Sequence, residues 1–273
     1  MGQNRKGGRH LFFTMAIAIL EPVAYIAERL LPLPKKQVRA VLFAQGRTGS
    51  TLLENLISST GFFRETGELL STVRGEIRDP ARFVLGLAKL TPWRNLIFHV
   101  KLCHLTSDRQ KPVDPKQFLG VLNGAGFGVI YLRRRNLVRH RISTLVAMER
   151  NKWHTADSDR ERAVKIRVDC QRMVKKVEEK NRFRQEEIAA LADIPYCELV
   201  YEDDLESVEC HQATVDKVLS FLGLESRLAN THLEKITPKR LDQLVENYGE
   251  LQHTLRAHDW GHFIDESMSE MRS

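Results

Sequence analysis

The stretch Val41-Leu42-Phe43-Ala44-Gln45-Gly46-Arg47-Thr48-Gly49-Ser50-Thr51-Leu52-Leu53 decides the fold of this 273-residue chain. It begins as a buried apolar strand, and Leu52, Leu53, Leu56 and Ile57 then recur at helical spacing. Where a strand turns sharply into a helix, several backbone N–H groups point at one spot in front of the positive end of the helix dipole. The glycines, hydroxyls and arginine of this turn predict an anion site formed by Gly46, Arg47, Thr48, Gly49, Ser50 and Thr51. The alternative is a plain strand–helix turn capped by a hydroxyl.

This loop differs from the Walker loop that binds nucleoside triphosphates. A Walker loop has four residues between its glycines and a lysine before Ser or Thr. Here only Arg47 and Thr48 separate Gly46 from Gly49, and no lysine follows. The sequence therefore disfavours ATP or GTP hydrolysis. A P-loop-type kinase of small molecules stays an alternative, as does a non-catalytic protein that binds an anion or a glycan.

Four short apolar runs are suited to buried parallel strands. They lie at Ala40–Ala44, Leu96–Leu102, Val129–Leu132 and Tyr196–Tyr201. A segment with helical spacing follows each run, and this alternation predicts an α/β fold with a central parallel β-sheet flanked by helices. No linker rich in Gly, Ser or Pro divides the chain, which favours a single domain over residues 39–273.

A charged stretch, Ser158–Leu191, lies between the third and fourth predicted strands. Its apolar residues Ile166, Cys170, Met173 and Val177 recur at helical intervals, which predicts one or two long helices with a solvated basic face. Because the charges of this stretch have mixed signs, we do not expect it to bind nucleic acid.

The glycine-containing loop resembles the 5′-phosphosulfate loop of sulfotransferases, which take a sulfuryl group from 3′-phosphoadenosine 5′-phosphosulfate (PAPS). In that family an aromatic or apolar strand end leads into Arg/Lys-Ser/Thr-Gly-Ser/Thr-Thr/Ser, and Arg47-Thr48-Gly49-Ser50-Thr51 fits this pattern. Cytosolic members have a lysine where this chain has Arg47, whereas bacterial carbohydrate sulfotransferases have arginine. The resemblance implies a P-loop-NTPase-like three-layer fold, PAPS as the sulfuryl donor and no metal ion. It gives Arg47 the lysine's role toward the bridging oxygen.

A second segment is similar to the 3′-phosphate site of the same family, in which a strand ends in arginine and the following helix presents a serine about two turns later. Here Val129–Leu132 leads into Arg133-Arg134-Arg135-Asn136, and Ser143 stands eight positions after Arg135. Arg135 has the usual family spacing, whereas Arg134 fits better when counted from the strand, so both are candidates. A guanidinium offers two parallel donors to a phosphate. Taken alone, an arginine run at a helix start is more often a solvated surface feature.

Further segments resemble sulfotransferases related to the nodulation-factor and trehalose enzymes, in the family's order. Gly67-Glu68-Leu69-Leu70 resembles a segment whose glutamate is a candidate base, and Phe98–His104 resembles a strand that carries a lysine. The resemblance implies Glu68 as the general base, with His104 and His99 as alternatives, and Lys101 as a contact to the sulfonate or the acceptor. Each of these residues also has a purely structural interpretation. Family-like segments at Val200–Asp203, Phe221–Leu224 and Val245–Leu251 extend the resemblance to residues 39 to about 263.

Residues 1–38 have no counterpart in that family. Basic Arg5, Lys6 and Arg9 precede the apolar run Leu11–Leu20, and apolar residues resume over Val23–Leu33. A bilayer span needs about 20 apolar residues, so we expect a helix at the membrane interface and peripheral membrane contact through Leu11–Leu33. A helix packed on the core is the second interpretation, and a signal anchor is the third.

The charge balance indicates an anionic partner, because 42 Lys and Arg outnumber 35 Asp and Glu and the formal net charge is +7. The resemblance favours a carbohydrate acceptor, and a glycolipid headgroup or a small alcohol are the alternatives. The cysteines form no CxxC pair and lie at no metal-ligand spacing with histidines, which predicts no metal site. They favour a reducing cytoplasm over an oxidising compartment. Nothing in the sequence indicates an oligomeric state.

Overall fold

The computed structural model of the chain describes residues 17, 19–64, 66–149, 165–233 and 240–264. The chain divides into two compact units. The first comprises Met1–Arg133 and Glu187–Asn230, and the second comprises Arg134–Glu186 and Thr231–Ser273. The domain boundary expected near residue 38 stays a prediction.

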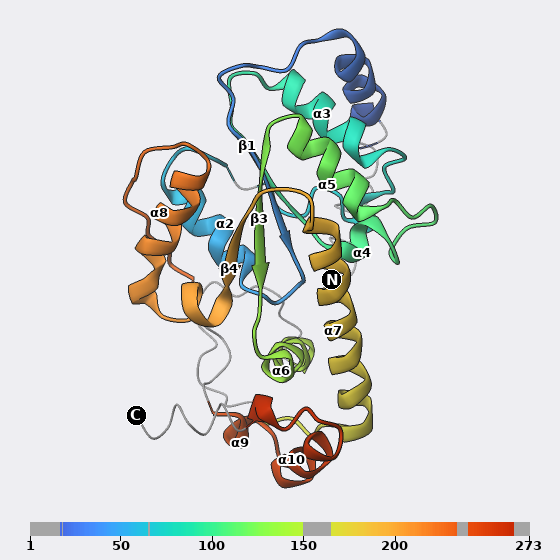
Figure 1. Cartoon of the computed structure of the whole chain (residues 1–273), viewed down its shortest axis with the longest axis vertical. Helices are drawn as coiled ribbons and strands as arrows, with labels where there is room; N and C mark the ends of the chain where they lie inside the picture. The colour runs from blue at the N-terminus through green and yellow to red at the C-terminus, as the bar shows by residue number, and fades with distance from the viewer. Residues whose placement is uncertain (1–16, 18, 65, 150–164, 234–239, 265–273) are drawn as a thin grey trace, which may run out of the picture. The chain divides into compact units, whose positions relative to one another are not determined.

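Four parallel strands form the central sheet of the first unit (Figure 1). They are β1 (Arg39–Ala44), β2 (Leu96–Val100), β3 (Phe127–Arg133) and β4 (Tyr196–Val200), in the order β2-β1-β3-β4. Phe43 pairs with Val100 on one side and with Tyr131 on the other, so the carboxyl ends of β1, β2 and β3 meet at one edge. All four predicted strands are confirmed.

Two of the predicted strands are shorter than expected at their carboxyl ends. β2 ends at Val100, because Lys101 caps the short helix α4 (Leu102–Leu105). β4 ends at Val200, because Tyr201 begins the π-helical turn η2 (Tyr201–Leu205). The apolar side chains of Leu102 and Tyr201 are buried all the same, so hydropathy alone gave no sign that the strands had ended.

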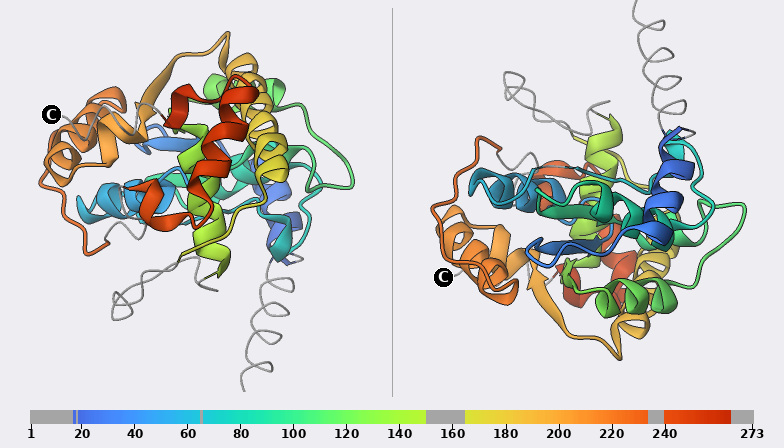
Figure 2. Two further views of the ribbon diagram at one scale, coloured as in Figure 1. Left: turned by 90° about the horizontal axis from the view of Figure 1, so that it is seen from below. Right: turned by 90° about the horizontal axis from the view of Figure 1, so that it is seen from above.

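Helices cover both faces of this sheet (Figures 1 and 2). On one face α2 (Ser50–Ser59) and α8 (His211–Phe221) pack against alternate strand residues that include Leu42, Leu132 and Leu199. On the other face lie α3 (Pro80–Leu90) and α5 (Pro115–Gly124). Successive strand residues point to opposite faces, and because both faces are covered the strands read as unbroken apolar runs. The predicted three-layer, P-loop-like α/β class is confirmed.

The first unit also contains a helix ahead of β1, at residues 19–30, which we call the N-terminal helix. It packs on α3 so closely that a Cβ atom on Gly86 would lie 2.0 Å from the carbonyl oxygen of Ala24, which only glycine tolerates. Of the apolar run Leu11–Leu20, residues 11–16 and 18 lie outside the described residues. Within the part of the chain that is described, no helix is both long and apolar enough to cross a membrane.

The first unit also contains the short elements η1 (Thr72–Arg74) and η3 (Val208–Cys210).

The second unit contains α6 (Leu137–Glu149), most of α7 (Cys170–Leu191), α9 (Leu241–Leu244) and α10 (Tyr248–Ala257). Their apolar faces share one core, in which Ile142, Met173 and Leu251 are buried. The long helix predicted in the charged stretch is confirmed over α7, whereas residues 158–164 of that stretch lie outside the described residues.

One residue of the predicted helical pattern was assigned to the wrong backbone state. Ile166 is extended and forms an isolated parallel bridge with Val245, in which its N–H donates to the Leu244 carbonyl at 2.8 Å. The Asn247 side chain fixes the same segment by pairing with both the N–H and the carbonyl of Val168. Ile166 fitted the helical spacing because its side chain enters the same core as that of Met173.

Candidate active site

The loop between β1 and α2 presents the amino end of a ten-residue helix. Gly49 caps α2 with a left-handed backbone (φ 94°, ψ 11°), and no side chain caps the helix. The N–H of Leu53 makes the first helical bond, to the Gly49 carbonyl at 3.0 Å, so the N–H groups of Ser50, Thr51 and Leu52 have no partner inside the helix. The first turn contains no acidic residue. This end of α2 therefore presents the donors and the dipole that the sequence predicts for an anion site.

Two positions of this loop have a backbone conformation that side chains rarely adopt. Arg47 has φ 68°, a left-handed conformation that is strained for any residue with a Cβ atom. Gly49 combines a positive φ with close packing, because a Cβ atom there would lie 2.7 Å from the ring of Tyr201. The Val200–Asp203 segment that resembled a family motif thus shapes the loop through Tyr201.

Polar contacts inside the first unit hold the base of the loop. Thr48 is buried, and its hydroxyl donates to the Gln45 carbonyl at 2.8 Å. The Gln45 amide donates to Glu187 Oε2 at 3.2 Å, and the Tyr131 hydroxyl donates to the same oxygen at 3.1 Å. Thr51 is exposed. Glu187 is a positioning residue that sequence reasoning missed, because it lies on α7, far along the chain.

Lys101, at the end of β2, brings a second cation to the loop. A Cβ atom on Gly46 would lie 3.5 Å from Lys101 Cε and 3.7 Å from Lys101 Nζ, so the ammonium group lies beside that glycine. The same Nζ lies 2.5 Å from Glu68 Oε1. Glu68 reaches this position because its segment runs along the edge of the sheet, where the N–H of His99 donates to the Gly67 carbonyl at 3.0 Å. Lys101 therefore connects the loop with the predicted base.

Two histidines complete the surroundings of Glu68. His104 Nε2 lies 3.4 Å from Glu68 Oε2, and His99 Nδ1 lies 3.9 Å from Glu68 Oε1. Both histidines are buried, whereas the Glu68 side chain is 35% exposed. The structure thus groups four of the predicted residues, Glu68, Lys101, His99 and His104, with the carboxylate as the accessible member.

This cluster keeps Glu68 ionised. Burial alone would raise its pKa, but the hydrogen bond from His104 and the ion pair with Lys101 outweigh burial and hold the pKa of Glu68 well below its usual value. Burial lowers the pKa of His99 to about 4, so that this ring is neutral at pH 7. The carboxylate can therefore accept a proton or orient a hydroxyl across the physiological pH range.

The hydrogen bonds of His99 and His104 show which ring nitrogens donate and which accept. The backbone N–H of Lys101 lies 3.4 Å from His104 Nδ1, which makes Nδ1 the acceptor and Nε2 the donor toward Glu68. His99 Nε2 faces the Ala44 carbonyl at 3.0 Å and must donate to it. His104 therefore orients Glu68 by donating to it, whereas Nδ1 of the neutral His99 ring is an acceptor and cannot donate to the carboxylate. Both rings are buried, which makes them less suitable than Glu68 as the base.

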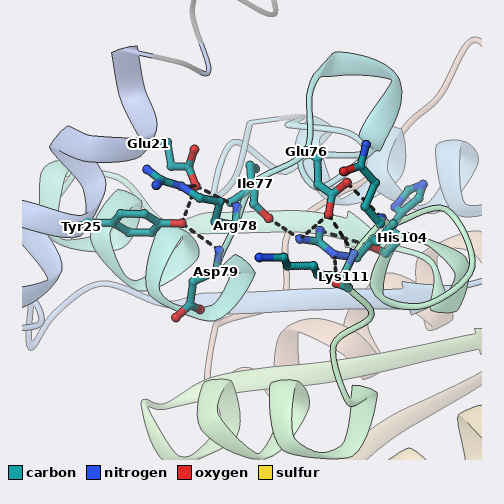
Figure 3. Close-up of polar contacts among 10 residues, drawn as sticks. Glu21, Tyr25, Glu76, Ile77, Arg78, Asp79, His104 and Lys111 are labelled. Carbon is teal, nitrogen blue, oxygen red and sulfur yellow. Dashed lines mark hydrogen bonds and ion pairs between the residues drawn. The ribbon is translucent and has the colours of Figure 1, made fainter.

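Buried Arg109 holds α4, and with it His104, by donating to three backbone carbonyls, and the residues that supply these carbonyls are labelled in Figure 3. Its Nη1 donates to the His104 carbonyl at 3.5 Å, its Nε donates to the Lys111 carbonyl at 3.2 Å, and its Nη2 donates to the Ile77 carbonyl. Glu76 lies 3.7 Å from the same guanidinium. Arg109 is another positioning residue, and no local motif in the sequence indicates it.

Among the described residues, one group has donors close enough together to hold a metal ion. Cys103 Sγ, a ring nitrogen of His104 and a carboxylate oxygen of Asp108 lie within 4.8 Å of one another. Burial raises the pKa of Cys103 to about 12, so a metal ion that bound this sulfur would have to displace its proton. The ring of His104 is also already engaged by Lys101 and Glu68.

The residues predicted to bind the 3′-phosphate lie in the second unit. Arg134 is buried and Arg135 is exposed at the start of α6, and Ser143 is buried two turns along that helix. Asn136 caps α6 by accepting from the Arg139 N–H at 2.9 Å. Arg184 of α7 donates to the carbonyls of both Arg134 and Arg135, which brings a third guanidinium to this helix start. The sequence did not indicate Arg184 as a candidate for the phosphate site, because the surrounding stretch has the pattern of a solvated charged helix.

Comparison with known proteins finds similarity among solved structures. No family model matches the sequence, and no curated protein matches it. A search of solved structures finds similarity to a sulfotransferase from Alicyclobacillus acidocaldarius, with 14% sequence identity and a TM-score of 0.45. The similarity covers 86% of this chain and 96% of the other.

Proposed function

We propose that this protein is a sulfotransferase that moves the sulfuryl group of PAPS to a hydroxyl group of an acceptor. The observation that carries the proposal is the position of Lys101, whose ammonium group lies beside Gly46 of the anion-binding loop and is ion-paired with the accessible carboxylate of Glu68. A cation for the donor and a base for the acceptor are thus neighbours at the carboxyl edge of the sheet. Ligands of open parallel sheets bind at this edge.

The 5′-phosphosulfate would bind at the amino end of α2. The backbone N–H groups of Ser50, Thr51 and Leu52, the hydroxyl of Thr51 and the guanidinium of Arg47 would meet its oxygens. These donors are fixed before the substrate arrives, so they stabilise charge that develops during transfer without reorganising.

The transfer itself would be an in-line displacement at sulfur. The acceptor oxygen forms a bond to sulfur while the bond from sulfur to the bridging phosphate oxygen breaks, and adenosine 3′,5′-bisphosphate leaves with the electron pair of that bond. The hydroxyl proton passes to the Glu68 carboxylate. Lys101 would face the sulfuryl oxygens, and Arg47 would face the bridging oxygen, in the role that the resemblance gives it.

Glu68 suits the role of base through its position and its charge. Its lowered pKa makes it a weak base for removing a proton from a free alcohol. In a loose transition state the proton leaves late, when the attacking oxygen has become acidic, and a carboxylate that is always ionised then serves well. His104 and Lys101 fix the direction of the carboxylate, which lowers the entropy cost of aligning the acceptor.

We assign the 3′-phosphate of the donor to the arginine-rich start of α6. Arg135 is the exposed guanidinium there, Arg184 adds a further charge, and Ser143 follows on the same helix. Two or three guanidinium groups in one place favour a dianionic phosphate over a hydroxyl group. This assignment would distinguish PAPS from nucleotides that lack the 3′ group. For the acceptor we favour a carbohydrate, on the sequence resemblance described above.

Two measurements test the proposal. Calorimetric titration should show binding of adenosine 3′,5′-bisphosphate without added metal, and weaker binding of ATP with Mg²⁺. A panel of glycans, glycolipids and small alcohols should then be incubated with sulfur-labelled PAPS, with and without a chelator. We expect label in at least one acceptor, with the same yield when chelator is present. Preference for ATP with Mg²⁺ would instead support a kinase, and nucleotide binding without transfer to any acceptor would leave a non-catalytic binding protein.

A further inference from the structure

The N-terminal helix has one side bound to the first unit and another side open to solvent. Ile19, Val23, Ile26 and Leu30 follow one another at helical spacing and are 68%, 43%, 59% and 71% exposed. We call these four residues the outward stripe. Scattered exposed apolar residues are ordinary, but a continuous stripe on one helix marks a surface that meets another apolar phase.

The opposite side of the same helix is fixed by specific contacts, so the stripe is not a loosely placed segment (Figure 3). The Glu21 carboxylate accepts from the N–H of Arg78 at 2.8 Å and from the Tyr25 hydroxyl at 2.5 Å. That hydroxyl also accepts from the N–H of Asp79 at 2.8 Å, just before α3 begins. Glu28 pairs with Arg82 at 3.0 Å, and Ala24 packs against Gly86. The unit therefore holds the helix in one rotational setting and turns the stripe outward.

We propose that the outward stripe inserts into the surface of a membrane that contains anionic lipids. The charges around the stripe favour this occupant. Arg5, Lys6 and Arg9 precede the helix, no acidic residue occurs among the first 20 residues, and exposed Lys35 and Lys36 follow it. A helix with an apolar face and basic flanks fits the boundary between lipid headgroups and acyl chains.

A second copy of the chain fits this surface less well. The sequence is basic both before and after the helix, so pairing two copies would bring like charges together whichever way the helices ran. An anionic lipid surface complements both flanks at once. The inference is independent of sulfuryl transfer, since the stripe does not include a residue of the candidate active site.

The test measures cosedimentation of the full chain with lipid vesicles. We expect binding to vesicles that contain phosphatidylglycerol, weaker binding to vesicles of phosphatidylcholine alone, and a decrease with added salt. Replacing Ile26→Glu together with Leu30→Glu should weaken binding to the anionic vesicles about tenfold or more. The matched control is Val208→Glu with Leu228→Glu, which makes the same change at side chains that are 78% and 86% exposed and should bind like the original chain.

Thermal unfolding followed by circular dichroism should be alike for both double variants, since all four positions are exposed. Three results would overturn the proposal: no binding of the original chain to either vesicle, equal binding by the stripe variant, or equal loss in the control variant. Light scattering, which measures the oligomeric state, tests whether a second copy of the chain binds the outward stripe instead. A dimer that the stripe substitutions convert to a monomer, in a chain that ignores vesicles, would assign the stripe to a second copy.

Discussion

Replacing Glu68 by Gln isolates the charge of the proposed base. Glutamine has the same shape, and its carbonyl oxygen can still accept from His104 Nε2, while its amide nitrogen replaces the oxygen that faces Lys101 and cannot accept from the ammonium group. What is lost is the negative charge beside Lys101 and the ability to take a proton. We expect turnover to fall about 10²- to 10⁴-fold, the range for a positioned general base. The affinity for PAPS should stay within a few-fold and shift toward tighter binding, because a negative charge near an anionic donor has been removed.

The same substitution has a stability effect whose sign follows from the lowered pKa. The carboxylate's stabilising contribution is complete at neutral pH and is lost only as the pH falls through its lowered pKa, below the usual value of 4.5. Glu68→Gln should thus reduce the free energy of unfolding at pH 7 by about 1 kcal/mol, a small value because more than a third of the side chain is exposed and the pair is screened. The difference should shrink in acid, as measured by urea unfolding.

A matched variant separates proton transfer from a general charge effect. Glu225→Gln removes another ion-paired glutamate of the first unit, which lies 2.9 Å from Arg227 and carries no assigned role. It should leave turnover and PAPS affinity unchanged. Full turnover in Glu68→Gln would refute the assignment of the base, and an equal loss in both variants would attribute the effect to net charge.

Three further substitutions test the surroundings. His104→Phe removes the donor that helps to lower the pKa of Glu68, so the acid limb of the pH–rate profile should move to higher pH; an unmoved limb would contradict the assigned hydrogen bond. Gly49→Ala should lower the free energy of unfolding by about 1–3 kcal/mol in denaturant titrations, because of its positive φ and the ring of Tyr201, whereas a neutral effect would show that the loop adapts. Arg135→Ala should weaken binding of adenosine 3′,5′-bisphosphate about 10- to 100-fold by calorimetry and leave adenosine 5′-phosphate unaffected. Equal losses for both nucleotides would move the 3′-phosphate elsewhere.

The sheet could be predicted from sequence because its strands are covered on both faces. Apolar residues then follow one another without alternation, and β1 to β4 stand out between charged helices. Strand ends were harder to predict, because the burial of a side chain does not show whether its backbone belongs to a strand or to a helix. Leu102 fits the apolar run of a strand but lies on the helix that follows it. Ile166 fits the spacing of a helix but lies on an isolated bridge that precedes it.

The residues that the structure groups at the candidate site could be predicted where they cluster in short segments. Glu68, Lys101 and the loop were found through their local motifs, and the parallel pairing of β1 with β2 brings Lys101 to Gly46. Glu187, Arg109 and Arg184 were not found, because each acts on a segment distant in sequence and contributes a single side chain. Such contacts leave no pattern in one sequence. Glu65, which precedes the segment that holds Glu68, lies outside the described residues.

The contact between the N-terminal helix and α3 limits how this protein can be shortened. A chain trimmed by protease or by design to begin near Lys35 would lose the oxygens of Glu21 and Tyr25 that accept from the Arg78 and Asp79 amides. It would also uncover the surface around Gly86, against which Ala24 packs. The trimmed product should aggregate or melt earlier for reasons unrelated to lipid. Point substitutions on the outer side are therefore the sound way to test the proposed membrane contact while preserving the candidate active site.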